Sequence, residues 1–451
     1  MKQILWFRRD LRISDNEILA YAKGEVLPIF IFDTNILNKL SRDDKRVSFI
    51  YERVLKLKEE LKEINLDLAL FYGDPKEIFK HLKTHGFNKV LCGVDHDAYA
   101  LKRDNEIEQI MPMQRFNNSF LLHPNQHLNQ SNLPYKVFTP FYKALHWMWS
   151  AMSLETVSRN PVLSLSPYPM PRTPSLEEMG FEAQTLATFL SKSPEMLVAL
   201  LISKLDNYEV DRDFFAKEAT SQLSVYLRFG LLSPKEFFNS IRPYANSQSV
   251  IRQLFFREFY NYLLYHFPHT AFQNHKKIEI KWDNNRQNFQ KWCSGETGVP
   301  IVDAAMRHLN ATGCMHNRLR MIVASYLTKN LLIDWRWGEK YFAQKLLDYE
   351  ASSNIASWQW AASTGTDAVP YFRVFNPYTQ SEKFDKEGTF IRRVIPELKQ
   401  VKSKLLHQEN GVQNNLFVDY VPMIVSIQNS RQEAIRRFKE ANARKVSHES
   451  V

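Results

Sequence analysis

The sequence predicts an α/β domain with a five-stranded, doubly wound parallel sheet, followed by an all-α domain. The first 125 residues alternate short continuous apolar runs with amphipathic stretches, which is typical of parallel strands covered by helices. Beyond residue 181, strand patterns nearly vanish and helical periodicity dominates. Between these regions, residues 161–174 hold five prolines among serines, as expected of an extended connection.

Short apolar runs locate the strands of the first domain. Strands are expected at Ile4–Phe7, Val26–Phe32, Leu66–Phe71, Val90–Gly93 and Ser119–Leu122. Apolar residues at helical spacing predict a helix over 47–64. Asp74 and Pro75 are typical of a helix start and Gly86 of a helix end. No G-x-G-x-x-G follows any of these strands, so a standard dinucleotide site is not predicted.

Helical spacing dominates the second half of the chain. Helices are expected over 186–205, 233–241, 249–267, 302–310, 319–332 and 337–348, with a basic amphipathic helix over 429–443. Segment 346–377 shows neither period and is dense in polar and aromatic residues, which favours a functional loop. We therefore expect domains at 1–130 and 196–451, joined by a connection over 131–195.

The positive charge of the chain is concentrated in its second part. The net charge is +10, and residues 1–200 carry 25 Lys and Arg against 24 Asp and Glu, whereas residues 201–451 carry 34 against 25. Six of the nine tryptophans lie within 282–360. A basic surface with aromatic side chains indicates a nucleic-acid binder. The alternative is a solvated basic surface around an aromatic core.

The three cysteines are far apart in the sequence. Their spacing excludes a zinc ribbon and a four-cysteine iron–sulfur cluster, and it fits a reducing compartment. We expect no metal site. The first residues lack a signal-peptide pattern, and no apolar run approaches the roughly 20 residues of a membrane span. The sequence therefore predicts a cytoplasmic protein with no membrane partner.

Three segments of the second half combine polar groups that suit a ligand. Thr220, Ser221 and Ser224 are clustered hydroxyls at a helix start, which suits phosphate, although a simple N-cap is the alternative. Segment 252–264 places Arg257 among aromatic residues, as a core helix with one ion pair would also do.

The third segment, 312–327, mixes an amide, two guanidinium groups and a thioether over five residues. These are Asn317, Arg318, Arg320 and Met321. Taken alone, the segment is equally typical of a helix start with a solvated basic face.

Together with 346–377, these segments resemble the photolyase/cryptochrome family, most closely the class I cyclobutane pyrimidine dimer photolyases. The resemblance runs from WFRRDLRISDN (6–16) through YKVFTPFYKA (135–144) to PELKQ (396–400). WQWAASTGTDAVPYFRVFNP (358–377) is its most specific segment. It implies a deoxyribodipyrimidine photo-lyase, in which light-excited reduced FAD donates an electron to a pyrimidine dimer flipped out of UV-damaged DNA. The dimer splits and the electron returns.

The resemblance also implies which residues bind FAD. The matching positions are Tyr208, Thr220, Ser221, Gln222, Leu223, Ser224, Arg257, Asn317, Arg320, Asp348, Glu350 and Asn354. Arg320 and Asp348 would lie at the flavin edge, where a positive charge favours an anionic reduced flavin. Asn354 would face flavin N5, where a neutral amide does not readily donate a proton.

Three tryptophans, Trp358, Trp335 and Trp282, match the family's electron relay. Three core tryptophans would be the alternative, since tryptophan is mostly buried. The positions that match the DNA and dimer contacts are Arg212, Gln253, Phe256, Cys314, Asn317, Arg318, Met321, Trp360 and Arg373.

Four positions depart from the commonest family pattern. Gln253 stands where a Glu often contacts the lesion, and Phe256 and Cys314 each replace a Trp. These changes remove stacking area or a charge-assisted hydrogen bond, so weaker dimer binding is expected, with repair retained. Glu350 keeps a carboxylate where Asp is usual.

The resemblance leaves a second, antenna chromophore open. Residues 93–104 carry Tyr99 and Ala100 in place of the Asn-Glu pair of a folate antenna, and they are closer to the deazaflavin version. An ordinary helix start is the alternative interpretation.

Two other functions are alternatives to repair. A cryptochrome-like blue-light photoreceptor is the main alternative, but Asn354, the triplet 316–318 and the basic second half favour repair. A structural nucleic-acid binder would leave the tryptophan relay unexplained. We expect a monomer with no obligate protein partner.

Overall fold

The computed structural model of the chain describes residues 2–150 and 153–449 and forms two compact units. The first unit comprises Met1–Tyr135, Thr139–Ser203 and Ser221–His266, and the second comprises Lys136–Phe138, Lys204–Thr220 and Phe267–Val451. The predicted boundaries at 130 and 195 stay a prediction, and residues 151–152 of the predicted connection lie outside the described residues.

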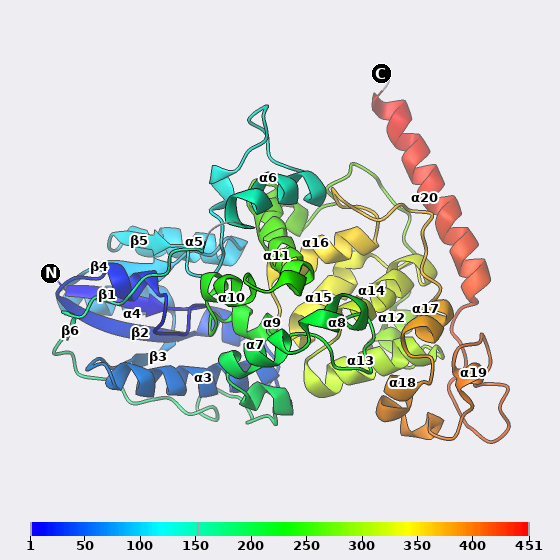
Figure 1. Cartoon of the computed structure of the whole chain (residues 1–451), viewed down its shortest axis with the longest axis horizontal. Coiled ribbons are helices and arrows are strands. Elements are labelled where there is room, and N and C mark those ends of the chain that lie inside the picture. Colours follow the sequence, from blue (N-terminus) through cyan, green and yellow to red (C-terminus); the bar gives the residue numbers. More distant parts are fainter. Residues whose placement is uncertain (1, 151–152, 450–451) are drawn as a thin grey trace. The chain divides into compact units, whose positions relative to one another are not determined.

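A parallel sheet forms the centre of the first unit (Figure 1). Its strands are β1 (Lys2–Phe7), β2 (Glu25–Asp33), β3 (Ala69–Gly73), β4 (Phe87–Gly93) and β5 (Met113–Phe116), in the order β3-β2-β1-β4-β5. All four neighbouring pairs are parallel. The chain winds outward from β1 in one direction and then, from β4, in the other, which confirms the predicted doubly wound parallel sheet. The predicted number of five strands is one too few, because a sixth strand pairs with β2.

A sixth strand of two residues, β6 (Ser164–Leu165), lies within the predicted connection. It pairs in parallel with Glu25 and Val26 at the start of β2. β3 pairs only with the second half of β2, from Ile29 onward, so β6 covers the edge that β3 leaves open. Two residues are too few for an apolar pattern to reveal.

The predicted fifth strand was misplaced. β5 lies six residues earlier than Ser119–Leu122, and of its four residues only Phe116 is buried. An edge strand with one buried residue leaves no apolar run to detect. Phe120 and Leu122 are buried in the following loop instead, and the backbone N–H groups of Leu121 and Leu122 donate to the Glu258 carboxylate at 3.0 Å.

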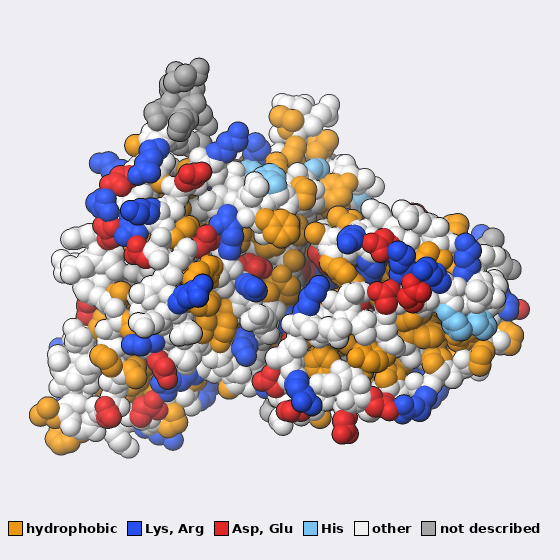
Figure 2. Space-filling model, turned by 180° about the vertical axis from the view of Figure 1, so that it is seen from behind, with side chains coloured by type: hydrophobic (Ala, Val, Ile, Leu, Met, Phe, Trp, Pro, Cys, Tyr) orange, Lys and Arg blue, Asp and Glu red, His pale blue; other side chains and the backbone are white. Residues whose placement is uncertain are grey.

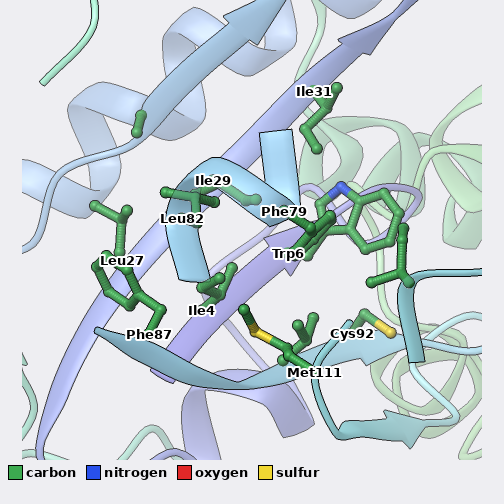
Figure 3. Packing of buried hydrophobic residues seen from close by; sticks show 13 residues of the cluster. Ile4, Trp6, Leu27, Ile29, Ile31, Phe79, Leu82, Phe87, Cys92 and Met111 are labelled. Atoms are coloured by element: carbon green, nitrogen blue, oxygen red, sulfur yellow. The ribbon is translucent and has the colours of Figure 1, made fainter. Parts of the chain in front are cut away.

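Helices α3 (Lys45–Lys62), α4 (Pro75–Thr84) and α5 (Ala98–Glu108) flank this sheet. Each begins with an aspartate whose carboxylate accepts a backbone N–H of the first turn, which satisfies donors that a helix start leaves free. Figure 3 shows Phe79 and Leu82 of α4 packed beside Ile4, Trp6 and Ile29 of the strands.

Further helices complete the first unit: α1 (Glu17–Tyr21), α2 (Thr34–Leu37), α6 (Phe138–Ser150), α7 (Pro194–Ile202), α9 (Ser224–Arg228), α10 (Pro234–Ile241) and α11 (Gln248–His266). The helix predicted over 186–205 is wrong in extent. Ser193 caps the start of α7, and Pro194 lacks the N–H that a continuous helix needs. A 3-10 turn, Thr188–Ser191, precedes it.

Every secondary-structure element among the described residues of the second unit is a helix or a helical turn, which confirms the predicted all-α region. Its helices are α8 (Leu205–Asp211), α12 (Arg286–Ser294), α13 (Pro300–Thr312), α14 (Asn317–Ser325), α15 (Trp335–Lys345), α16 (Ala351–Ala361), α17 (Pro377–Phe384), α18 (Thr389–Val394), α19 (Ser403–Leu406) and α20 (Ile427–Glu449). A π-helical turn, Tyr326–Asn330, follows α14, and all five of its residues are buried. No helix among the described residues is long and apolar enough to cross a membrane.

Helix α16 lies in the segment that was predicted to be aperiodic. Its buried residues include Ser352, Asn354, Ile355, Trp358 and Gln359 and so point to more than one side of the helix. A helix packed on most of its surface has no polar face, and therefore no helical period.

Candidate functional site

The predicted FAD-binding residues fall in both units. Ser221, Gln222, Leu223, Ser224 and Arg257 belong to the first unit, whereas Tyr208, Thr220, Asn317, Arg320, Asp348, Glu350 and Asn354 belong to the second. We describe the two groups separately.

Arg320 of α14 and Asp348, which follows α15, form an oriented ion pair in the second unit. Arg320 Nη2 donates to both carboxylate oxygens of Asp348, at 3.0 and 2.8 Å, and Arg320 Nε donates to the Met315 carbonyl at 2.9 Å. The side chains are 29% and 9% exposed. The pair is therefore held in place by the protein and still open on one side.

Asn354 of α16 is fixed by the side chain of Glu339. Its Nδ2 donates to the Glu339 backbone oxygen and to Oε1, both at 3.1 Å, and the Tyr349 hydroxyl donates to the same Oε1 at 3.3 Å. Burial raises the pKa of Glu339. These contacts set the orientation of the amide, because only the nitrogen of Asn354 can donate.

The start of α14 is capped by His316. Its Nδ1 accepts the Arg318 N–H at 3.1 Å, and its Nε2 lies 2.8 Å from the Arg212 carbonyl. Burial lowers the pKa of His316 to about 4. The ring is thus neutral, with its proton on Nε2, because a carbonyl can only accept.

Arg318, predicted to contact DNA, is engaged within the second unit. Its Nη2 lies 2.7 Å from Asp213 Oδ2, and its guanidinium carbon lies 4.6 Å from the Phe384 ring centroid. Asn317 is exposed, and its Nδ2 lies 3.7 Å from the Met321 sulfur.

The other predicted residues of the second unit vary in exposure. Arg373 is exposed, Trp360 and Cys314 are half-buried, and Tyr208 and Glu350 are buried. Burial raises the pKa of Cys314 to about 12. Among the described residues, no group of three or more His, Cys, Asp or Glu side chains could hold a metal ion.

The three predicted relay tryptophans all lie in the second unit. Trp335 is 0% and Trp358 2% exposed, while Trp282 is half-buried. The Trp335 indole N–H donates to Asn274 Oδ1 at 2.8 Å. Trp358 packs edge-on against Phe342, with ring centroids 5.1 Å apart.

In the first unit, Arg257 is tied to backbone carbonyls. Its Nη1 donates to the Ser119 oxygen at 2.6 Å and its Nη2 to the Leu227 oxygen at 3.3 Å. Nearby in sequence, Phe256 packs on Tyr260 with ring centroids 6.0 Å apart, and Gln253 Nε2 donates to the Ser249 oxygen at 3.1 Å.

The hydroxyl cluster of the first unit precedes α9. Ser221 Oγ accepts the Leu223 N–H at 3.4 Å, and Ser224 is the first residue of the helix. Gln222 has a positive φ of 56°, which is uncommon for a residue with a side chain.

The second-unit residues fit a flavin. Arg320 supplies donors, Asp348 supplies acceptors, and Asn354 supplies an amide of fixed orientation, the mixture that a flavin ring edge with N–H and carbonyl groups requires. Sequence reasoning assigned no structural role to Glu339, which holds Asn354, to His316, which caps α14, or to Asn274, which accepts a hydrogen bond from Trp335. No local pattern marks Glu339 or Asn274. His316 lies three residues before the helix predicted over 319–332, and it is the N-cap because α14 begins earlier, at Asn317.

Comparisons with known proteins agree with this fold. Residues 3–157 match the family model described as DNA photolyase, and residues 250–440 match the FAD binding domain of DNA photolyase. The chain belongs to the photolyase/cryptochrome family and contains an FAD-binding domain.

Relatives place the chain among the photolyases of this family. Deoxyribodipyrimidine photo-lyases of Vibrio cholerae and Escherichia coli are each 35% identical to it; each match covers 97% of this chain and 99% or 98% of the relative. A class III photolyase structure from Agrobacterium tumefaciens has a TM-score of 0.85 at 31% identity and covers 98% of both chains.

Two further structures share the fold. An archaeal photolyase from Sulfolobus tokodaii with two FAD molecules has a TM-score of 0.84 at 29% identity, covering 98% of this chain and 100% of that one. A Synechocystis cryptochrome has a TM-score of 0.86 at 24% identity, covering 97% and 99%, and shows the fold alone. The chain is thus an enzyme of the carbon–carbon lyase kind that uses FAD in light-driven DNA repair.

Proposed function

We propose that the chain repairs cyclobutane pyrimidine dimers in UV-damaged DNA. The observation that carries this proposal is the group formed by the oriented Arg320–Asp348 pair and the fixed amide of Asn354. FAD, when bound and reduced, supplies light absorption and a one-electron donor. The protein has to bind it, keep its charge state and exclude competing protons.

Arg320 and Asp348 have the first two tasks, binding and control of the charge state. The guanidinium places a positive charge beside the cofactor, and Asp348 prevents that charge from rotating away. A fixed cation stabilises an anionic form of a neighbouring group and lowers its pKa. We propose that the pair holds the flavin edge and favours the anionic reduced state.

Asn354 has the third task, the exclusion of protons. An amide carries no titratable proton, and its N–H group is committed to Glu339. Burial raises the pKa of the neighbouring Glu339, and the carboxylate of this residue accepts a hydrogen bond from the amide. We propose that Asn354 limits proton donation to the reduced cofactor.

The proposed DNA contacts are Arg212, Gln253, Phe256, Cys314, Asn317, Arg318, Met321, Trp360 and Arg373. On the face drawn in Figure 2, Lys and Arg side chains are mixed with Asp and Glu side chains. We therefore expect phosphate binding from individual cations such as the exposed Arg373, with a steep salt dependence of affinity. Phe256 and Cys314 offer less stacking area than Trp, so moderate dimer affinity is expected.

The relay proposal concerns reactivation of the enzyme. Trp358, Trp335 and Trp282 would pass electrons one at a time toward oxidised cofactor. Burial of the first two and partial exposure of Trp282 support a path that begins at the protein surface.

A cytoplasmic monomer with no obligate partner also remains our proposal. The three cysteines are free, which fits a reducing compartment. A deazaflavin or folate antenna on the first unit is a further proposal. There, Tyr99 donates to Asp33, and burial raises the pKa of the Tyr99 hydroxyl, so the ring is held by the protein itself.

The test is a repair assay on dimer-containing oligothymidine with purified protein carrying reduced FAD. Dimers should disappear under blue light and persist in the dark, and Arg320→Ala should lower the bound FAD. Arg393→Ala is the matched control, because that arginine forms an exposed ion pair with Glu218. Intact dimers after illumination of protein with reduced FAD would contradict the proposal and favour a cryptochrome-like photoreceptor.

A further inference from the structure

Trp335 differs from the other two relay tryptophans in the partner of its indole N–H. The ring is 0% exposed, and the N–H donates to Asn274 Oδ1 at 2.8 Å. Among the described residues, neither Trp358 nor Trp282 has a hydrogen bond from its indole nitrogen. A feature confined to the middle tryptophan therefore calls for an explanation.

The orientation of the Asn274 amide follows from its two partners. The indole nitrogen can only donate, so it requires the amide oxygen. The Asn274 Nδ2 donates to the Ile278 backbone carbonyl at 3.0 Å, and this carbonyl can only accept. Asn274 thus presents an oxygen to Trp335 and cannot rotate without losing both hydrogen bonds.

Satisfying a buried N–H does not by itself require a side-chain amide. Trp292 is equally buried, and its indole N–H donates to the Val323 backbone carbonyl at 3.1 Å. A backbone carbonyl is sufficient for packing. Burial of the Trp335 N–H therefore explains why it has an acceptor, but it does not explain why that acceptor is a side-chain amide.

Charges around Trp335 give the amide a function. The Arg336 guanidinium carbon lies 5.0 Å from the Trp335 ring centroid, and a nearby cation opposes removal of an electron from the ring. Asp334, 2.7 Å from Arg336 Nη1, offsets part of that charge. The Asn274 oxygen acts at the N–H group, which becomes more acidic and more positive when the ring is oxidised.

We propose that Asn274 is a positioning residue for electron transfer through Trp335, which stabilises the oxidised ring without accepting its proton. This inference rests on the proposed tryptophan relay. One electron leaves Trp335 and restores oxidised Trp358, whose electron has gone to light-excited oxidised FAD. Trp335 keeps its N–H proton and carries one positive charge until an electron from Trp282 restores it. A soluble thiol reductant then refills Trp282.

The amide is suited to this step because it accepts a hydrogen bond and is not a base near neutral pH. A carboxylate at the same position would take the proton. The positive charge would then be trapped at the middle of the relay as a neutral tryptophan radical. With the amide, the charge stays mobile.

The experiment compares Asn274→Leu and Asn274→Asp with the wild type and with Asn310→Leu. Asn310 is a matched control in the same unit: its Oδ1 accepts the Tyr341 hydroxyl at 2.6 Å, and its Nδ2 donates to the Cys293 carbonyl at 2.8 Å. The first readout is the indole N–H resonance of Trp335 in protein labelled with ¹⁵N-tryptophan, which needs no cofactor and is assigned with Trp335→Phe. It should shift in both Asn274 variants and stay unchanged in Asn310→Leu.

The second readout is transient absorption of tryptophan radicals during photoreduction of the holoenzyme. Asn274→Leu should slow electron transfer to the surface about tenfold, the worth of one hydrogen bond to a charged group. Asn274→Asp, measured at alkaline pH where its carboxylate is ionised, should form a neutral radical early. Arg336, whose guanidinium lies over the Trp335 ring, and Asp334, which pairs with Arg336, are unchanged in every variant.

The outcomes separate this inference from the relay itself. If Trp335→Phe photoreduces like the wild type, the relay is wrong. If Trp335→Phe blocks photoreduction while both Asn274 variants retain wild-type rates and radical spectra, the role of Asn274 is overturned and the relay stands.

Discussion

Two arginine–carboxylate pairs, one in each unit, have the same chemistry and different surroundings. In the first unit, Arg8 Nη1 lies 2.6 Å from Asp104 Oδ1, and the side chains are 9% and 4% exposed. Arg103 also pairs with Asp104, at 2.9 Å, and the Arg8 and Arg103 guanidinium groups lie 4.6 and 4.7 Å from the Trp6 ring centroid. In the second unit, Arg320 and Asp348 are 29% and 9% exposed.

The difference shows how burial separates a structural pair from a binding pair. Asp104 pairs with two guanidinium groups that are only 9% and 12% exposed, so removing it leaves their charge uncompensated in a mostly buried place. The Arg320 guanidinium retains access to solvent or to a ligand on one side. The same ion pair is therefore part of the fold in one unit and a candidate cofactor contact in the other.

The largest expected effect is the loss of stability when the mostly buried Arg8–Asp104 pair is broken. Asp104→Ala should lower the free energy of unfolding by about 3–5 kcal/mol, because it strands buried charge. Asp348→Ala should cost about 1 kcal/mol, since its arginine can be solvated. Denaturant unfolding of both variants measures the contrast, and equal losses would remove the distinction between the pairs.

His316 extends the comparison to a closed group of the second unit. Its folded pKa, about 4, lies below the unfolded value of 6.5. Stability from the neutral ring is present above pH 6.5 and is lost as pH falls toward 4, by as much as about 3 kcal/mol. Unfolding measured against pH should show this slope, and His316→Asn, which keeps a helix cap, should flatten it. An unchanged slope would assign the acid sensitivity to another group, such as His275.

Breaking the partly exposed Arg320–Asp348 pair should change FAD binding more than it changes the stability of the fold. Arg320→Ala removes a charge-assisted contact and should weaken FAD binding about 10- to 100-fold, with little change in unfolding of the apoprotein. Fluorescence titration of FAD into apoprotein measures it, with Arg393→Ala as control. A large loss of apoprotein stability would instead show that Arg320, like Arg8, mainly stabilises the fold.

The smallest effect is expected at Asn354. Asn354→Asp would place a second carboxylate about 3 Å from Glu339, as the amide nitrogen now lies. Two carboxylates this close cannot both ionise, so the pair should retain a proton and a raised pKa in the folded state. Stability should then fall by about 1–2 kcal/mol as pH rises from about 4 to 8. Glu339→Gln in the same chain should restore the wild-type profile.

The elements that could be predicted from the sequence are the central strands of the sheet and the helices that are buried on one side only. β1, β2 and β4 appear as apolar runs because they are covered on both faces, and the Asp-Pro start of α4 is a local signal. The edge strand β5 and the enclosed helix α16 had no usable period. Most candidate site residues came from the family resemblance, and it did not reveal Glu339 and Asn274, because their partners lie 15 and 61 residues away.

One missing methyl group sets a spacing in the second unit. A Cβ at Gly338 of α15 would collide with the Trp358 ring, so α15 and α16 approach as they do because this position is glycine. Glycine inside a helix is about 1 kcal/mol less favourable than alanine. At position 338 this lower helix propensity is the consequence of the close approach between α15 and the Trp358 ring. Position 338 therefore controls this distance: replacing glycine by alanine would move α15 away from Trp358 and leave every tryptophan chemically intact.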